Sequence, residues 1–287
     1  MDVAFVRSLQ EMAGSRRCKI GIGIWNADAE LIASLHSAGE YADLLVVGPP
    51  GSEALFEGLS GLEYHPAEEP WEELVRLLRD GVIEGAVRGN LPAGRTMRAL
   101  ASQFHIRVRR LALLEQNGWA FLLGPVGIDE GETAADRLQL LLGGAGLLQR
   151  LGVAPLRAAV LSGGRMEDRG RCRRVDTSLA EGEEIAEKGR CAGIAACHKG
   201  ILIESCRGDD MVIAPEGVSG NLIFRTLLLL CGANSYGAPV LMEKIFIDSS
   251  RARGSFDGPV MLAAALAAIR AKRNFDSIES HQKLEML

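Results

Sequence analysis

This sequence of 287 residues has few aromatic residues, no long apolar run and no excess of basic charge. Only 5% of the residues are aromatic while 47% are hydrophobic, so we expect cores of Leu, Ile, Val and Ala. No apolar run reaches the roughly 18 residues that a membrane-spanning helix needs. The formal net charge is −5, whereas nucleic-acid-binding proteins generally present a basic surface. We therefore expect neither a membrane nor a nucleic acid as a partner.

The sequence also lacks the cysteine patterns of metal sites and disulfide frameworks. Its six cysteines are dispersed, and none belongs to a Cys-x-x-Cys pair. The spacing of Cys191, Cys197 and His198 fits no common zinc pattern, so we expect no metal site. The start, Met1-Asp2-Val3, shows no basic region followed by an apolar stretch, so no secretory signal is expected. The sequence thus predicts a cytoplasmic protein with free thiols.

Short apolar runs alternate with helical patterns along most of the chain. This alternation predicts crossover units and a mainly parallel sheet with helices on both faces, which is an α/β fold. The predicted strands are residues 19–25, 44–47, 85–87, 111–114, 119–123, 158–161, 201–203, 211–214 and 245–247. The predicted helices are residues 28–37, 70–78, 94–103, 133–151, 179–188, 220–230 and 257–272. Ligands of such folds bind beyond the carboxyl ends of the strands, where several polar segments fall.

No low-complexity linker divides the chain, but its character changes twice. Arginines punctuate an extended stretch at 104–115, and a second change falls at 236–239. These changes predict a first α/β domain of residues 1–107 plus 236–287 and a second α/β domain of residues 108–235. The polar tail from Asn274 to Leu287 is expected to fray.

The segment after the apolar run 245–247 is the first candidate for chemistry. It contains Ser250 and Arg251, and Asp257 follows six residues after the arginine. A guanidinium matches phosphate geometry and a carboxylate accepts protons, so these residues indicate catalysis on a small anionic substrate. The structural alternative is that Asp257, before Gly258-Pro259, caps a helix and pairs with Arg251. Both interpretations stay open on these residues alone.

A second candidate is the helix start at Gly94-Arg95-Thr96-Met97-Arg98. Arginines there oppose the helix dipole, and a bound anion would relieve the conflict. The alternative is a loop with solvated arginines. The earlier Gly21-Ile22-Gly23 lacks the third glycine of a dinucleotide fingerprint, so a tight turn is the better interpretation.

Two further candidates follow strands in the middle of the chain. Ser162-Gly163-Gly164 leads into a loop with five arginines between 165 and 174, a composition that suits the phosphates of coenzyme A. The alternative is a solvated loop balanced by its acidic residues. The segment 214–222 joins a strand to an apolar helix, whose start is suited to an anion or is capped by Ser219.

In order along the chain, these segments resemble the phosphate acetyl/butyryltransferase family. That family carries Pro-Asp at a strand end and Gly-Asn at the next helix start, and Pro215-Glu216 and Gly220-Asn221 match at the same spacing. The segment 236–239 is similar to the family's Tyr-Gly-Pro, and the segment 248–251 is similar to its Asn-Asp-Leu-Ser-Arg-Gly. Asp257 is similar to the family's Asp six residues past the Arg. The segment 95–99 is similar to the family's Asp-Thr-Leu-Arg-Pro, and the segment 159–162 is similar to its Ala-Met-Leu-Ser. The order is kept over roughly residues 80–270.

The resemblance implies two α/β domains with a cleft, a fold related to isocitrate/isopropylmalate dehydrogenases, and a homodimer. It implies acyl transfer between phosphate and coenzyme A, with coenzyme A as a substrate and no tightly bound cofactor. In this interpretation Asp257 is the base, Ser250 and Arg251 are its catalytic neighbours, and Arg98 binds substrate. The matching segments add Ser162, Gly220 and Asn221 as expected substrate-binding residues.

The chain also departs from the family pattern. Ala252 replaces the glycine after the arginine, and Ser162-Gly163-Gly164-Arg165 replaces Ser-Tyr-Ser-Thr. The short, arginine-rich form is similar to a methanogen group called methanogenesis marker protein 4, or MtxX, which is labelled methyltransferase-related. Two alternatives to acyl transfer follow: a non-catalytic binding or regulatory homologue, and a methyltransferase-related protein of methanogenesis.

Overall fold

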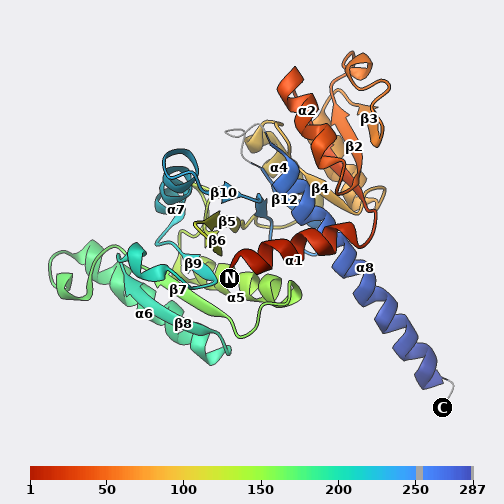
Figure 1. The fold of residues 1–287 in the computed structure, drawn as a ribbon. Coiled ribbons are helices and arrows are strands. Elements are labelled where there is room, and N and C mark those ends of the chain that lie inside the picture. Colours follow the sequence, from red (N-terminus) through yellow and green to blue (C-terminus); the bar gives the residue numbers. More distant parts are fainter. Residues whose placement is uncertain (250–254, 286–287) are drawn as a thin grey trace. The chain divides into compact units, whose positions relative to one another are not determined.

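The computed structural model describes residues 1–249 and 255–285, and it contains two compact units (Figure 1). The first unit consists of Arg7–Ile106 and Met242–Leu287, and the second consists of Met1–Val6 and Arg107–Leu241. The units divide the chain after Ile106 and Leu241, whereas the sequence placed the divisions after residues 107 and 235. Residues 1–6, which include the first residues of helix α1 (Val3–Gly14), belong to the second unit, where the Met1 amino group pairs with Asp210 at 2.6 Å.

A parallel sheet forms the centre of the first unit. Its strands run in the order β12-β4-β1-β2-β3, and every neighbouring pair is parallel. The strands are β1 (Lys19–Gly23), β2 (Asp43–Gly48), β3 (Leu62–Pro66), β4 (Gly85–Val87) and β12 (Ile245–Asp248). Their carboxyl ends therefore share one edge, which is where an α/β sheet binds its ligands.

Helices cover both faces of this sheet. One pair, α2 (Ala29–Ala38) and α8 (Asp257–Glu285), packs together, with α8 against β1, β4 and β12. The other pair, α3 (Pro70–Arg79) and α4 (Ala93–Phe104), also packs together, with α3 against β1, β2 and β4. Local sequence sets where two of these helices begin: Asp28 accepts a hydrogen bond from the Leu31 amide, and Pro70 occupies the first turn of α3.

The second unit has a mixed sheet of six strands in the order β10-β5-β6-β9-β7-β8. Strands β6, β9, β7 and β8 are parallel, while β5 is antiparallel to β6 and to β10. The strands are β5 (Ala112–Gln116), β6 (Trp119–Gly124), β7 (Arg157–Leu161), β8 (Ala195–Gly200), β9 (Met211–Ile213) and β10 (Asn234–Ser235). The short β11 (Ala238–Pro239) comes next in the chain and is not a strand of this sheet.

Three helices cover this mixed sheet. Helices α5 (Ala134–Arg150) and α6 (Arg173–Cys191) pack on each other, α5 against β9 and α6 against β7 and β8. Helix α7 (Gly217–Arg225) packs against β6 and continues into a π-helical turn at Thr226–Leu230. None of the helices within the described residues is long and apolar enough to cross a membrane.

Several elements differ from the sequence-based expectation. Helix α1 and strand β3 were not predicted; β3 is polar and ends in a proline, so it lacks the apolar signal of a strand. The strand predicted at 201–203 is wrong, because the strand is β8 and Ile203–Cys206 forms a 3-10 helix. β8 reads Ala-Ala-Cys-His-Lys-Gly and contains no β-branched residue. The tail predicted to fray continues α8 as far as Glu285.

A buried ion pair joins two strand ends in the first unit. Arg88 follows β4 and Asp248 ends β12, and their side chains are only 5% and 12% exposed. The Arg88 guanidinium donates from Nε to Asp248 and from Nη1 to the Leu91 carbonyl oxygen at 2.7 Å. Because these strands are adjacent in the sheet, the pair fixes the carboxyl edge of the first unit.

We expect Asp248→Asn to lower the free energy of unfolding by about 3 kcal/mol, because Arg88 would keep its buried charge without its counter-charge. The exposed pair Lys19–Glu63 provides the control, with side chains 39% and 65% exposed. Glu63→Gln is expected to change the free energy by less than about 1 kcal/mol. Urea unfolding followed by tryptophan fluorescence measures both, since Trp25 and Trp71 lie in the first unit. Equal effects of the two changes would contradict the prediction.

Candidate functional site

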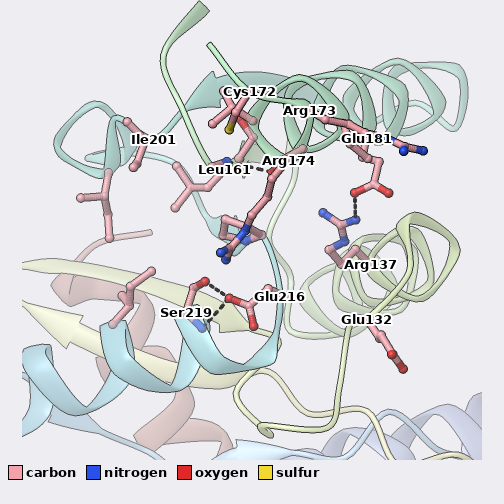
Figure 2. Close-up of a pocket in the computed structure, with 18 residues that line it drawn as sticks. Glu132, Arg137, Leu161, Cys172, Arg173, Arg174, Glu181, Ile201, Glu216 and Ser219 are labelled. Carbon is pink, nitrogen blue, oxygen red and sulfur yellow. Dashed lines mark hydrogen bonds and ion pairs between the residues drawn. The ribbon is translucent and has the colours of Figure 1, made fainter. Parts of the chain in front are cut away.

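A pocket of about 1080 Å³ lies within the second unit. It opens beyond the carboxyl ends of β7, β8 and β9, since the residues directly after these strands line it. Its apolar lining consists of Leu161, Val175, Ile201, Ile203, Pro215 and Ile223. Its charged lining consists of Glu132, Arg137, Arg173, Arg174, Glu181 and Glu216. Figure 2 shows Ile201 on one side and Arg137 with Glu181 on the other.

The apolar part of the pocket is partly open to solvent. Ile201 is 52% exposed and Ile203 is 39% exposed, although both are large aliphatic side chains. Exposed apolar residues inside a concave site are a feature of small-molecule binding sites. The pocket therefore provides an apolar surface beside a charged one.

Two helix starts face this pocket, and the start of α7 is already filled by a carboxylate. Glu216 is the N-cap residue: its Oε2 accepts from the Val218 amide at 2.7 Å and its Oε1 from the Ser219 amide at 2.9 Å. The Ser219 hydroxyl also donates to Glu216. Ser219, which the sequence offered as the cap, instead supports the glutamate that caps the helix. The positive end of α7 is thus neutralised by the chain itself.

The pKa of Glu216 reflects this capping role. Burial raises it, but hydrogen bonds from Ser219 and Val218 and the nearby charge of Arg174 outweigh burial, so the pKa lies below its ordinary value. The carboxylate form is therefore the stable form at neutral pH.

The start of α6 faces the same pocket and is not filled. Its N-cap residue is Cys172, whose side chain makes no capping hydrogen bond. Arg173 and Arg174 occupy the first turn, and neither makes an ion pair within the described residues. In Figure 2 the Arg174 side chain extends into the pocket toward Glu216 and Ser219. Unpaired arginines at an uncapped helix start oppose the helix dipole, an arrangement that an anion would stabilise.

Arg137 and Glu181 form the ion pair on the other side of the pocket. Arg137 Nη2 lies 2.6 Å from Glu181 Oε2, and the arginine side chain is 2% exposed. The pair connects α5 with α6, and Arg137 Nε also donates to the Thr133 carbonyl oxygen at 3.3 Å. A buried guanidinium that lines a cavity keeps a fixed charge there.

Ser162, which the sequence predicts to bind substrate, lies at the floor of the pocket. Its Oγ is 2.8 Å from His198 Nε2, and His198 Nδ1 is 3.4 Å from Glu183 Oε2. The serine is 0% exposed and the histidine side chain is 2% exposed. Burial lowers the pKa of His198, and Glu183 opposes this shift only partly. The imidazole is therefore neutral near pH 7.

Gly220 and Asn221, the other residues predicted to bind substrate in this unit, are not among those lining the pocket. A Cβ atom on Gly220 would lie 1.9 Å from the Pro125 carbonyl oxygen, so only glycine permits this approach of α7 to the loop after β6. The Asn221 amide donates to the Val126 carbonyl oxygen at 2.8 Å. Both residues hold α7 in place beside the pocket.

The remaining predicted residues belong to the first unit. Ser250 and Arg251 lie outside the described residues. Asp257 is the first residue of α8, where its Oδ2 accepts from the Ser255 hydroxyl at 2.8 Å. Its Oδ1 is buried and has no hydrogen-bond partner among the described residues. Arg98 is exposed on α4, and it makes no ion pair within the described residues.

Arg95, one turn before Arg98, has a partner of a different kind. Its guanidinium lies 4.5 Å from the ring centroid of Trp71, which in turn packs against Trp25 with 5.5 Å between centroids. The cation–π contact holds Arg95, so Arg98 is the arginine of this helix start that is left for a ligand.

Sequence reasoning missed several residues in and beside the pocket. Arg137 and Glu181 lie inside helical patterns, where charged residues normally face solvent. His198 lies on β8, which was not predicted, and Glu183 lies in the middle of α6, within the helix predicted at 179–188. The sequence analysis considered His198 only together with Cys191 and Cys197, as a possible zinc pattern. No group of three or more His, Cys, Asp or Glu side chains in the described part of the chain is placed to hold a metal ion.

The fold belongs to a known structural class. A phosphotransacetylase from Streptococcus pyogenes matches with a TM-score of 0.67 and 18% identity, over 93% of this chain and 98% of that one. A 4-hydroxythreonine-4-phosphate dehydrogenase from Klebsiella pneumoniae matches with a TM-score of 0.61 and 12% identity, over 88% and 98% of the two chains. At such identities the likeness concerns the fold alone, which is that of the phosphotransacetylases. The predicted relation to isocitrate dehydrogenases stays a prediction.

Sequence comparison gives the family. A protein of Methanosarcina mazei, provisionally named methyltransferase mtx subunit X, is 40% identical over 276 residues, which are 94% of this chain and 98% of that protein. No family model matches the chain. The chain belongs to the family of mtx subunit X, and the predicted resemblance to the methanogen MtxX group is confirmed.

We expect Glu216→Gln to lower the free energy of unfolding by about 1 kcal/mol at pH 7, because the helix start loses its charged cap. The pKa of Glu216 is depressed in the folded protein, so its contribution is present above the pKa of an unfolded glutamate. It is lost as the pH falls through the folded value. Chemical unfolding at pH 7 and in acid should show the difference between variant and parent shrinking below about pH 4.3.

Glu132→Gln is the matched control for this experiment, because Glu132 lines the same pocket but its side chain makes no hydrogen bond within the described residues. It should leave stability unchanged at both pH values. A difference for Glu216→Gln that persists unchanged in acid would contradict the proposed role of the carboxylate charge.

Proposed function

We propose that the protein is an acyltransferase of the phosphotransacylase type, which moves an acyl group between phosphate and the thiol of coenzyme A or a related anionic molecule. The observation that carries this proposal is the pocket of the second unit, where the unpaired Arg173 and Arg174 at the open start of α6 stand beside an apolar surface. The fold shared with phosphotransacetylases supports it.

The pocket suits a ligand with an anionic head and an apolar body. Arg174 extends into the cavity, and the start of α6, which has no side-chain cap, adds to its positive field. Glu216 fills the other helix start, so the phosphates of coenzyme A are expected at α6 rather than at α7. Ile201, Ile203 and Ile223 then receive the acyl chain or another apolar group.

Asp257, Arg251, Ser250 and Arg98 remain proposed catalytic and substrate-binding groups through the family resemblance. In that mechanism Asp257 takes the proton of the thiol, and the arginines hold the phosphate as it leaves. A carboxylate is a weak base for this step. Unperturbed thiols and carboxylic acids differ by about 4.6 pKa units, so the transfer is uphill by roughly 6 kcal/mol. Either the surroundings must destabilise the Asp257 carboxylate and so raise its pKa, or another group must act as the base.

A second candidate function comes from the relatives. The Methanosarcina mazei protein is named as a methyltransferase subunit, so a role in methyl transfer is the alternative. A binding or regulatory homologue without turnover is the third. A homodimer in the cytoplasm remains part of the proposal, as the resemblance implies.

Calorimetric titration with coenzyme A, acetyl-CoA, butyryl-CoA and S-adenosylmethionine separates these functions. We expect the acyl-CoA compounds to bind, and Arg174→Met to weaken them about tenfold because it removes one charge contact worth about 1.4 kcal/mol. Arg171→Met, in the loop just before α6, is the matched control, because Arg171 is exposed and pairs with Asp168. Binding of S-adenosylmethionine without binding of acyl-CoA would overturn the proposal in favour of methyl transfer.

Formation of acyl phosphate from acyl-CoA and phosphate tests turnover. We expect Asp257→Asn to reduce this rate by about 10²-fold if the carboxylate is the base, since a positioned base contributes at least that much. Unchanged turnover in Asp257→Asn would rule out the base role. Binding of acyl-CoA without any acyl phosphate would favour the non-catalytic homologue.

A further inference from the structure

Ser162 lines the pocket; beside it lie a buried histidine to which it is hydrogen-bonded and a glutamate that is close to, but not hydrogen-bonded to, the other ring nitrogen of that histidine. Ser162 Oγ lies 2.8 Å from His198 Nε2, and His198 Nδ1 lies 3.4 Å from Glu183 Oε2. We propose that His198 activates Ser162 as a nucleophile, which takes the acyl group of a thioester, acyl phosphate or activated ester as a covalent ester. This proposal rests on the proposed function only in assigning the acyl group to this pocket.

The order of the three groups is that of a nucleophile, a base and an orienting acid. If Nδ1 carries the ring proton toward Glu183, Nε2 is the acceptor and the Ser162 hydroxyl donates to it. The three residues come from different elements: Ser162 follows β7, His198 lies on β8 and Glu183 lies on α6. Their meeting is therefore a product of the tertiary fold rather than of one local turn.

The ring of His198 is held tightly in place. Gly182 on α6 faces it, and a Cβ atom there would lie 2.6 Å from His198 Nε2, so only glycine leaves room for the ring. The charged groups around it are Glu183, which also accepts from Arg190 at 3.1 Å, and Arg169 in the loop before α6. Burial and Arg169 both disfavour the imidazolium, so a neutral acceptor faces Ser162.

The reaction balances without a cofactor. The Ser162 Oγ–H proton moves to His198 Nε2 while Oγ bonds to the acyl carbonyl carbon. The bond to the leaving thiolate or phosphate then breaks with its electron pair, and the leaving group takes the proton from Nε2. Water or the acceptor thiol then reverses these steps. The attacking molecule gives a proton to Nε2 and bonds to the ester carbonyl carbon, and Ser162 Oγ leaves and takes this proton back from Nε2. A serine route also removes the need for a carboxylate to deprotonate a thiol in the acylation step.

Access to the serine sets a condition on this chemistry. Ser162 has no exposed surface, while the next residue, Gly163, is exposed and has no side chain. The acyl carbonyl must therefore approach over Gly163. The Gly163 amide already donates to the Ser178 hydroxyl at 2.8 Å, which holds this backbone in position at the start of the loop.

A fluorophosphonate probe tests the proposal directly, because it reacts covalently with activated serines and needs no coenzyme A. Intact-mass spectrometry of the full chain should show one adduct, and peptide mapping should place it on Ser162. Ser162→Ala should abolish it, and His198→Asn should slow it about 10²-fold because the general base is lost. His36→Asn, which changes an exposed histidine of the first unit, is the matched control and should leave labelling unchanged.

Glu183→Gln is a second variant at a side chain that is 48% exposed, so the fold does not depend on it. It should slow labelling less than His198→Asn does. Labelling of the parent should persist at mildly acidic pH. It should fall only when His198 is protonated, at a pH below the ordinary pKa of histidine. No adduct on Ser162, or an adduct formed equally fast in His198→Asn, would overturn the proposal. The probe works without coenzyme A, so failure here is distinguishable from failure of acyl-CoA to bind.

Discussion

Parallel pairing of strands is the constraint on which this molecule depends. Two parallel strands cannot be joined by a tight turn, so each connection crosses the sheet through a helix or long loop and all carboxyl ends meet at one edge. In the second unit this brings the residues after β7, β8 and β9 around one pocket. In the first unit it brings Arg88 and Asp248 together at the ends of β4 and β12. Residues far apart in sequence become neighbours for this single reason.

The charged side chains at the carboxyl edges of the two sheets are neutralised to different extents. In the first unit Arg88 and Asp248 neutralise each other within the protein. In the second unit Arg137 is satisfied by Glu181 and α7 by Glu216, but the start of α6 with Arg173 and Arg174 is not. The pocket is thus nearly balanced in formal charge, and its unsatisfied positive field is confined to one end. This localisation, rather than net charge, is what suits it to an anionic group.

The sequence was informative where local patterns carry the structure. Alternating apolar runs predicted the α/β fold, and the polar residues after predicted strands included Ser162, which does line the pocket. Glu216 was quoted only as part of a resemblance, because a cap depends on backbone geometry that spacing does not reveal. His198 escaped because β8 has little strand propensity. Gly220 and Asn221 are predicted to bind substrate; in the structure they contact Pro125 and Val126, and these contacts position α7.

The capping of α7 by Glu216 has a consequence for how a ligand enters. A cavity flanked by two open helix starts would accept a phosphate at either end, and a molecule with one charged terminus could lie in it in two opposite senses. Here the carboxylate of Glu216 occupies one of those places permanently, at an effective concentration that no free anion matches. The carboxylate thus acts as a built-in competitor that keeps other anions from the start of α7.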